Sequence, residues 1–231
     1  MTGVRHARDT VVVAIDGPSG SGKSSTARGV AARLGLRYLD TGAMYRAVTW
    51  WMLKHGVDPE DADAVAASAD RPVLSVATDP RAPGIAVDGM DVSRLIRDRP
   101  VSNAVSAVSA VPAVRRRLVA LQREIIGAGG IVVEGRDIGT VVAPGAPVKI
   151  FLTASAEARA GRRSAELTHD PAASRTVTHE EMSRRDRLDS SRATAPLAKA
   201  ADACELDTTP HSLDEVVELI LGLVKERTGV T

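Results

Sequence analysis

The chain has 231 residues, of which 44% are hydrophobic and 26% charged, and its net charge is +1. This composition is typical of a globular domain and provides no overall charge excess for binding nucleic acid or an anionic membrane. Aromatic residues make up only 2%, which disfavours a surface that stacks on single-stranded bases, and the single cysteine excludes an internal disulfide.

Targeting signals are not predicted. Residues 1–10 are polar and lack the apolar core of a signal peptide. No apolar run approaches the roughly 20 residues that a membrane-spanning helix needs. We therefore expect a cytoplasmic protein that binds neither a membrane nor nucleic acid.

Residues 17–24 read G-P-S-G-S-G-K-S, the pattern of a phosphate-binding loop. An apolar, β-branched run at 11–16 predicts a buried strand before it, and apolar residues at helical spacing predict a helix from 24 to 34 after it. Glycines allow backbone N–H groups to curl around phosphate oxygens, and the helix N-terminus adds partial positive charge. The residues predicted to bind the nucleotide are Gly17, Pro18, Ser19, Gly20, Ser21, Gly22, Lys23, Ser24 and Ser25.

Two side chains of this loop carry specific chemistry. The Lys23 ammonium can neutralise the β- and γ-phosphates, and the Ser24 hydroxyl can bind a magnesium ion. A strand is expected at 36–40 and a helix at 43–55, with Tyr45 and Arg46 in its first turns. Arg46 lies where it could hold an anion, although a solvated arginine on a helix face is the simpler interpretation of that residue alone.

The sequence pattern changes within residues 58–127. A short helix is expected at 59–69, and proline and glycine punctuate apolar pieces between 71 and 97, which predicts a small antiparallel sheet. Helices are expected at 101–110 and 112–126. Arg115, Arg116 and Arg117 begin the second of these, where the helix dipole disfavours cations. At least one of them should have an anionic or polar partner; a solvated basic face is the alternative.

A buried strand at 131–134 leads into G-R-D-I-G-T at 135–140. Ligands of open α/β sheets bind at the carboxyl ends of strands, so Arg136 and Asp137 are candidate site residues. Glu134 ends the strand and could face the magnesium shell. A purely structural Arg–Asp pair is the alternative.

The last part of the chain predicts a strand at 148–152, helices at 155–167 and 179–188, a strand at 203–206, and a capped helix from 212 to about 227. Arginines on the helices at 155–167 and 179–188 flank a polar loop at 169–177. This arrangement suits a lid that closes on phosphates, with a solvated basic hairpin as the alternative.

These motifs together resemble the bacterial cytidylate kinases, which are nucleoside monophosphate kinases with a phosphate-binding loop. The resemblance runs from Val11 to about Lys225 and includes L-D-T-G-A-M-Y-R at 39–46. It implies an α/β P-loop three-layer fold with a central parallel sheet, an inserted monophosphate-binding domain and a helical lid. The expected division is an ATP-binding core at 9–57 and 128–228, an insertion with a small β-sheet at 58–127, and a lid at 155–192.

The activity implied by the resemblance is transfer of the γ-phosphoryl group of ATP to CMP or dCMP, with Mg²⁺, by a monomer. One alternative is a kinase for another nucleoside monophosphate or small molecule. A GTPase-type switch is least favoured, because the chain lacks an N-K-x-D guanine-reading motif.

The resemblance also implies roles for individual residues. The expected catalytic residues are Lys23, Arg136, Arg159, Arg163 and Arg185. The expected acceptor-binding residues are Thr41, Tyr45, Arg46, Ser106, Arg115, Arg136, Asp137, Asp189 and Arg192. Magnesium is expected on Ser24, with Asp40 or Glu134 acting through water.

Overall fold

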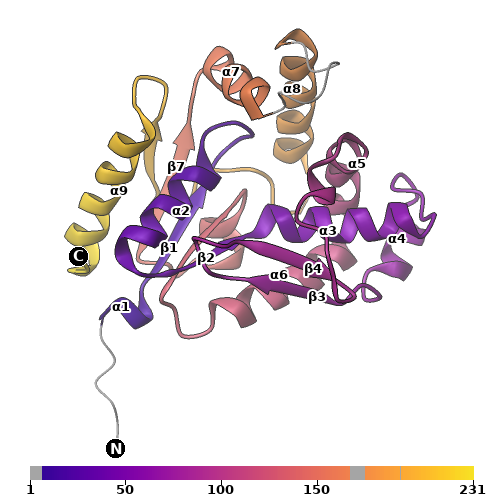
Figure 1. The fold of residues 1–231 in the computed structure, drawn as a ribbon, viewed down its shortest axis with the longest axis horizontal. Coiled ribbons are helices and arrows are strands. Elements are labelled where there is room, and N and C mark those ends of the chain that lie inside the picture. The colour runs from indigo at the N-terminus through magenta and orange to yellow at the C-terminus, as the bar shows by residue number, and fades with distance from the viewer. Residues whose placement is uncertain (1–6, 167–174, 193) are drawn as a thin grey trace, which may run out of the picture.

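The computed structural model describes residues 7–166, 175–192 and 194–231. Its centre is a five-stranded sheet in the order β2-β6-β1-β7-β8, in which every pairing is parallel. Figure 1 shows this sheet between layers of helices, which is the expected three-layer fold. The strands are β1 (Val12–Asp16), β2 (Arg37–Asp40), β6 (Ile131–Gly135), β7 (Val148–Thr153) and β8 (Cys204–Asp207).

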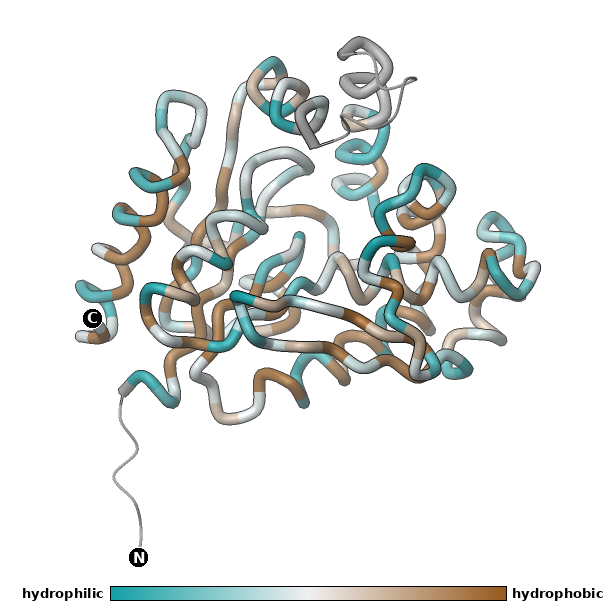
Figure 2. The backbone as a smooth tube through the Cα atoms, in the orientation of Figure 1, coloured by the Kyte–Doolittle hydropathy of each residue, from teal (hydrophilic) through white to brown (hydrophobic). Residues whose placement is uncertain are grey.

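Alternate residues of the strands enter two separate cores. Val13 and Ile15 of β1 pack with α2 (Lys23–Leu34) and α9 (Leu213–Thr228) on one face. Ala14 packs with α3 (Thr41–Lys54) and α6 (Pro112–Ile126) on the other. Burial on both faces explains why β1 and β6 begin as continuous apolar runs in the sequence. Helix α9 alternates brown and teal in Figure 2, which shows its single apolar face.

Residues 58–127 contain the predicted antiparallel sheet, formed by β3 (Leu74–Ala77), β4 (Gly84–Val87) and β5 (Met90–Asp91). The same region carries α4 (Ala62–Ser68), η1 (Leu95–Arg97) and α5 (Arg99–Ala110). The Tyr38 amide of edge strand β2 donates to the Thr78 carbonyl at 2.8 Å, so this region is tied to the central sheet. The domain boundaries themselves stay a prediction.

Several element boundaries differ from the predicted ones because side chains cap helices earlier or later than expected. Helix α3 begins at Thr41, two residues early, since the Asp40 carboxylate accepts from the Ala43 amide at 2.8 Å. Helix α4 begins at Ala62 rather than 59, since Asp61 caps it. The capping box of Ser212 and Glu215 is confirmed.

The region predicted to form a lid contains α7 (Ala156–Glu166) and α8 (Arg175–Ser191), which contact each other (Figure 1). Helix α8 begins four residues before the predicted helix at 179–188, so 175–177 are helical and not part of a loop. Residues 169–174 of the predicted loop lie outside the described residues. The first element of the described chain is the short helix α1 (Ala7–Thr10), and the last is α9.

Gly17 provides a test of how closely the phosphate-binding loop approaches the sheet. Its φ is +150°, and a Cβ there would overlap the backbone carbonyl of Leu152 in β7. Gly56 also has a positive φ, +70°, but a Cβ there would meet nothing within 4 Å. Backbone strain is therefore common to both positions, whereas steric overlap is confined to Gly17.

We expect Gly17→Ala to lower the free energy of unfolding by about 1–3 kcal/mol more than Gly56→Ala, as measured by urea unfolding, because a backbone overlap cannot relax through a rotamer change. Equal losses for the two variants would contradict the close approach of Gly17 to β7.

Candidate active site

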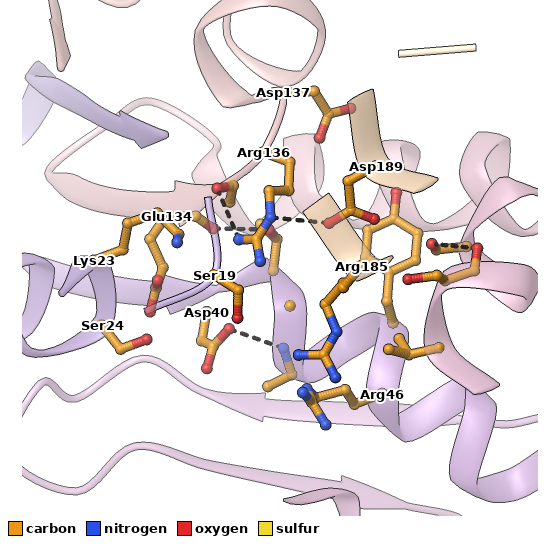
Figure 3. Close-up of a pocket in the computed structure, with 18 of the residues that line it drawn as sticks. Ser19, Lys23, Ser24, Asp40, Arg46, Glu134, Arg136, Asp137, Arg185 and Asp189 are labelled. Atoms are coloured by element: carbon orange, nitrogen blue, oxygen red, sulfur yellow. Dashed lines mark hydrogen bonds and ion pairs between the residues drawn. The ribbon is translucent and has the colours of Figure 1, made fainter. Parts of the chain in front are cut away.

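A cleft of about 480 Å³ opens at the carboxyl ends of β1, β2 and β6. It brings together side chains from the phosphate-binding loop, α3, α5, α6, the turn after β6, and α8 (Figure 3). The predicted site residues that line it are Ser19, Gly20, Gly22, Lys23, Ser24, Ser25, Asp40, Thr41, Tyr45, Arg46, Ser106, Arg115, Glu134, Arg136, Asp137, Arg185, Asp189 and Arg192. Gly17, Pro18 and Ser21 of the same loop are not among the residues that line the cleft.

Lys23 lies at the start of α2 and is almost fully buried. Its Nζ donates to the Pro18 carbonyl at 2.6 Å, so the ammonium lies across the loop. The pKa of Lys23 is lowered to about 7, mainly by burial and then by the Arg136 cation, while Glu134 and Asp186 oppose this shift. A bound anion would favour the charged form, which is the state a phosphate site needs.

Asp16 ends β1 and joins the phosphate-binding loop to the turn after β6. Its two carboxylate oxygens accept from the amides of Ile138 and Gly139, each at 2.8 Å. These amides begin the π-helical turn η2 (Ile138–Val142). Sequence reasoning assigned Asp16 no role, although an aspartate that ends a buried strand is a recognisable signal.

Arg115 and Asp137 form a buried ion pair in the lining of the cleft. Arg115 also donates to the Ser109 carbonyl at 3.2 Å and lies over the Tyr45 ring at 5.3 Å. Burial raises the pKa of Asp137, and Arg115 opposes that shift. The sequence predicted that at least one arginine at the start of the helix at 112–126 has an anionic or polar partner, and the Arg115–Asp137 pair confirms this.

Asp189 of α8 connects two further arginines. Arg136 Nε donates to it at 3.1 Å, drawn as a dashed line in Figure 3, and Arg192 lies 3.5 Å from its other oxygen. Arg185, one residue before Asp186 on the same helix, donates to the Ser102 carbonyl at 2.8 Å.

Ser102 on α5 is a residue that sequence reasoning missed. Arg46 donates to its hydroxyl at 2.9 Å and to the Ile96 carbonyl at 3.0 Å. Because Arg185 binds the same serine through its carbonyl, Ser102 brings two guanidinium groups from α3 and α8 to one side of the cleft (Figure 3). The weak apolar pattern of 101–110 gave no signal for this role.

Glu134 and Asp40 place two carboxylates near Ser24 at the rim of the phosphate-binding loop. The Tyr38 hydroxyl donates to Glu134. Burial and the Asp40 charge raise the pKa of Glu134 to about 7, against the lowering effect of Lys23. In the part of the chain that the structure describes, no group of three His, Cys, Asp or Glu side chains could hold a metal unaided.

The arginines of the predicted lid have separate partners. Arg159 pairs with Asp186 of α8 and donates to the Ser19 carbonyl at 3.1 Å, while Arg162 donates to Thr208 at 2.8 Å. The side chain of Arg163 lies outside the described part of the structure.

A model of the cytidylate kinase family matches residues 13–226. This chain belongs to the cytidylate kinase family. It is 57% identical over 226 residues to a cytidylate kinase of Streptomyces griseus subsp. griseus, covering 97% of this chain and 96% of the relative. A cytidylate kinase of Rhodococcus opacus is 52% identical over 223 residues, covering 96% and 97%.

A solved structure of an uncharacterized protein from Eubacterium ventriosum shares the fold, with a TM-score of 0.51 and 12% identity, covering 95% of this chain and 100% of that one. Within residues 7–166, 175–192 and 194–231, no helix is both long enough and apolar enough to cross a membrane.

Asp16 generates a pH prediction. Burial raises its pKa in the folded protein to about 6, so near pH 5 the folded protein retains a proton that the unfolded chain releases. The stabilisation from this proton is complete below the unfolded pKa and is lost as the pH rises through the folded pKa. Between about pH 5 and about pH 7, wild type should lose about 1 kcal/mol of unfolding free energy relative to Asp16→Asn. Urea unfolding at both pH values measures this difference, and a pH-independent difference would refute it.

Proposed function

We propose that this member of the family transfers the γ-phosphoryl group of ATP to CMP or dCMP, giving ADP and CDP or dCDP. The observation that carries the acceptor assignment is the buried Arg115–Asp137 pair, whose two residues line the same cleft as the phosphate-binding loop. The two groups offer a fixed donor and a fixed acceptor to a nucleobase edge.

Cytosine suits this pair. Its N4 amino group donates and its N3 and O2 atoms accept, so Asp137 can accept from N4 while Arg115 donates to N3 or O2. Uracil places an acceptor, O4, where cytosine has the amino group. Two acceptors would then face each other in a buried place, which costs about 1–3 kcal/mol for each unpaired group. Ser106 and Arg192, which line the same cleft, would complete the base contacts.

The acceptor phosphate is assigned to Arg46 and Arg136, with Thr41 and Tyr45 beside them, and the ribose to Asp189. Ser102 supports Arg46 from behind, and Asp189 supports Arg136. The attacking atom is a phosphate oxygen, which is already ionised at neutral pH. The reaction therefore needs positioning and charge stabilisation more than a general base.

The donor side is assigned to the phosphate-binding loop, in which Lys23 neutralises the phosphates of ATP. Arg159, Arg163 and Arg185 are assigned to the developing charge on the transferring group. Closure of the lid would exclude water, which otherwise accepts the phosphoryl group.

The donor set near Ser24 fits a magnesium ion that keeps most of its water. Ser24 would bind it directly, with Asp40 or Glu134 holding its water ligands, and substrate phosphates would complete the shell. When bound, the ion neutralises negative charge that develops on the phosphates. The raised pKa of Glu134 would fall beside such a cation. We also propose that the protein is a cytoplasmic monomer that binds neither nucleic acid nor a membrane.

The function is tested by ADP release with ATP and a panel of acceptors: CMP, dCMP, UMP and AMP. Release with CMP and dCMP well above that with UMP and AMP supports the proposal. Release that is highest with AMP or UMP would support the alternative of a kinase for another nucleoside monophosphate.

Asp137→Asn tests the basis of selection. The amide keeps the shape but adds a donor that suits uracil O4, and it removes the charge that pairs with Arg115. We expect kcat/KM to fall at least about 10-fold with CMP and much less with UMP.

Arg46→Ala is the matched control, because it contacts the phosphate that both acceptors share; its losses with CMP and UMP should be equal. If Asp137→Asn also lowers kcat/KM with CMP and with UMP by the same factor, Asp137 positions the turn after β6 and does not select the base.

A further inference from the structure

Asp186 joins helix α8 to the phosphate-binding loop. Its Oδ1 accepts from the Ser19 amide at 3.0 Å, and its Oδ2 pairs with Arg159 of α7. The same Arg159 nitrogen donates to the Ser19 carbonyl at 3.1 Å. One carboxylate and one guanidinium therefore bind both backbone polar groups of a single loop residue.

The surroundings hold this cluster in place. The side chains of Arg159 and Asp186 are only 16% and 17% exposed. Met182, one turn earlier on α8, is buried against the loop, where a Cβ added to Gly20 would lie 2.7 Å from its terminal methyl. Arg159 Nε is buried and has no partner among the described residues, so part of this guanidinium still lacks a hydrogen-bond acceptor.

The neighbouring residues Arg185 and Asp186 connect α8 to two different elements around the cleft. Arg185 binds Ser102 of α5, on the acceptor side, and Asp186 binds Ser19, on the donor side. A long arginine side chain samples many rotamers unless a partner restricts it, and a loss of orientation of about 1 Å can cost about 100-fold in rate.

We propose that Asp186 is a positioning residue for phosphoryl transfer: it holds the Arg159 guanidinium at the rim of the phosphate-binding loop. The inference rests on the proposed function and deepens it. Asp186 itself contacts no reacting atom; it acts through Arg159 and Ser19. A positioning residue of this kind should affect kcat more than the KM for the acceptor, because its partners Ser19 and Arg159 are not among the residues assigned to CMP.

The test is a double-mutant cycle with Asp186→Asn and Arg159→Met, using purified folded proteins checked by urea unfolding. Asparagine retains an acceptor for the Ser19 amide and removes only the charge that holds Arg159. We expect Asp186→Asn to lower kcat by about 10- to 100-fold and Arg159→Met by about 100-fold, with the KM for CMP changed less than about threefold. The double variant should be no more than about threefold slower than Arg159→Met alone.

Glu218→Gln is the control, because it removes an ion pair with Arg33 at 2.6 Å on the exposed surface of α9 and α2; its kcat should equal that of wild type. Additive losses in the double variant, a loss confined to KM, or a kcat for Asp186→Asn within twofold of wild type would each overturn the inference while wild type remains active with CMP. Lack of CMP-dependent ADP release by wild type would instead overturn the proposed function, and this inference with it. If Asp186→Asn does not fold, Asp186→Ser, which also removes the carboxylate charge, enters the same cycle with the same criteria.

Discussion

Buried positive charge is the constraint around which the cleft is organised. A site for two phosphorylated substrates needs several cations, yet a cation withdrawn from water is costly unless a carboxylate or polar group pairs with it. The cleft meets this requirement with aspartates: Arg115 pairs with Asp137, and Arg136 pairs with Asp189. The arginines are thereby oriented before any anion arrives, so binding need not order them.

The central sheet determines where these charges meet. Strands β1 and β6 are neighbours and parallel, so the phosphate-binding loop and the turn after β6 emerge at the same edge. Asp16 ties the two together through the amides of Ile138 and Gly139. The phosphate-binding loop and the turn that carries Arg136 therefore share one base, and Asp189 of α8 binds Arg136 from a separate helix.

Local sequence patterns predicted the elements well, because each depends on its own residues. The phosphate-binding loop, the small antiparallel sheet and the capping box at Ser212 follow from glycine conformation, turn residues and side-chain reach. The partners across the cleft could not be predicted: Ser102 lies 83 residues from Arg185, and Asp186 lies 167 from Ser19. Which faces of two distant helices meet depends on packing, which periodicity does not specify. The predicted division into domains and the assignments to substrates stay predictions.

The claim that paired buried charges organise the cleft is tested most directly by a thermodynamic cycle at Arg115 and Asp137. Removing either partner alone, with Arg115→Met or Asp137→Leu, should cost about 3–5 kcal/mol of unfolding free energy, because the remaining charge is buried without its partner. The double variant, measured by urea unfolding, should lose far less than the sum of the two. Additive losses would show that the two residues act independently and would contradict the account.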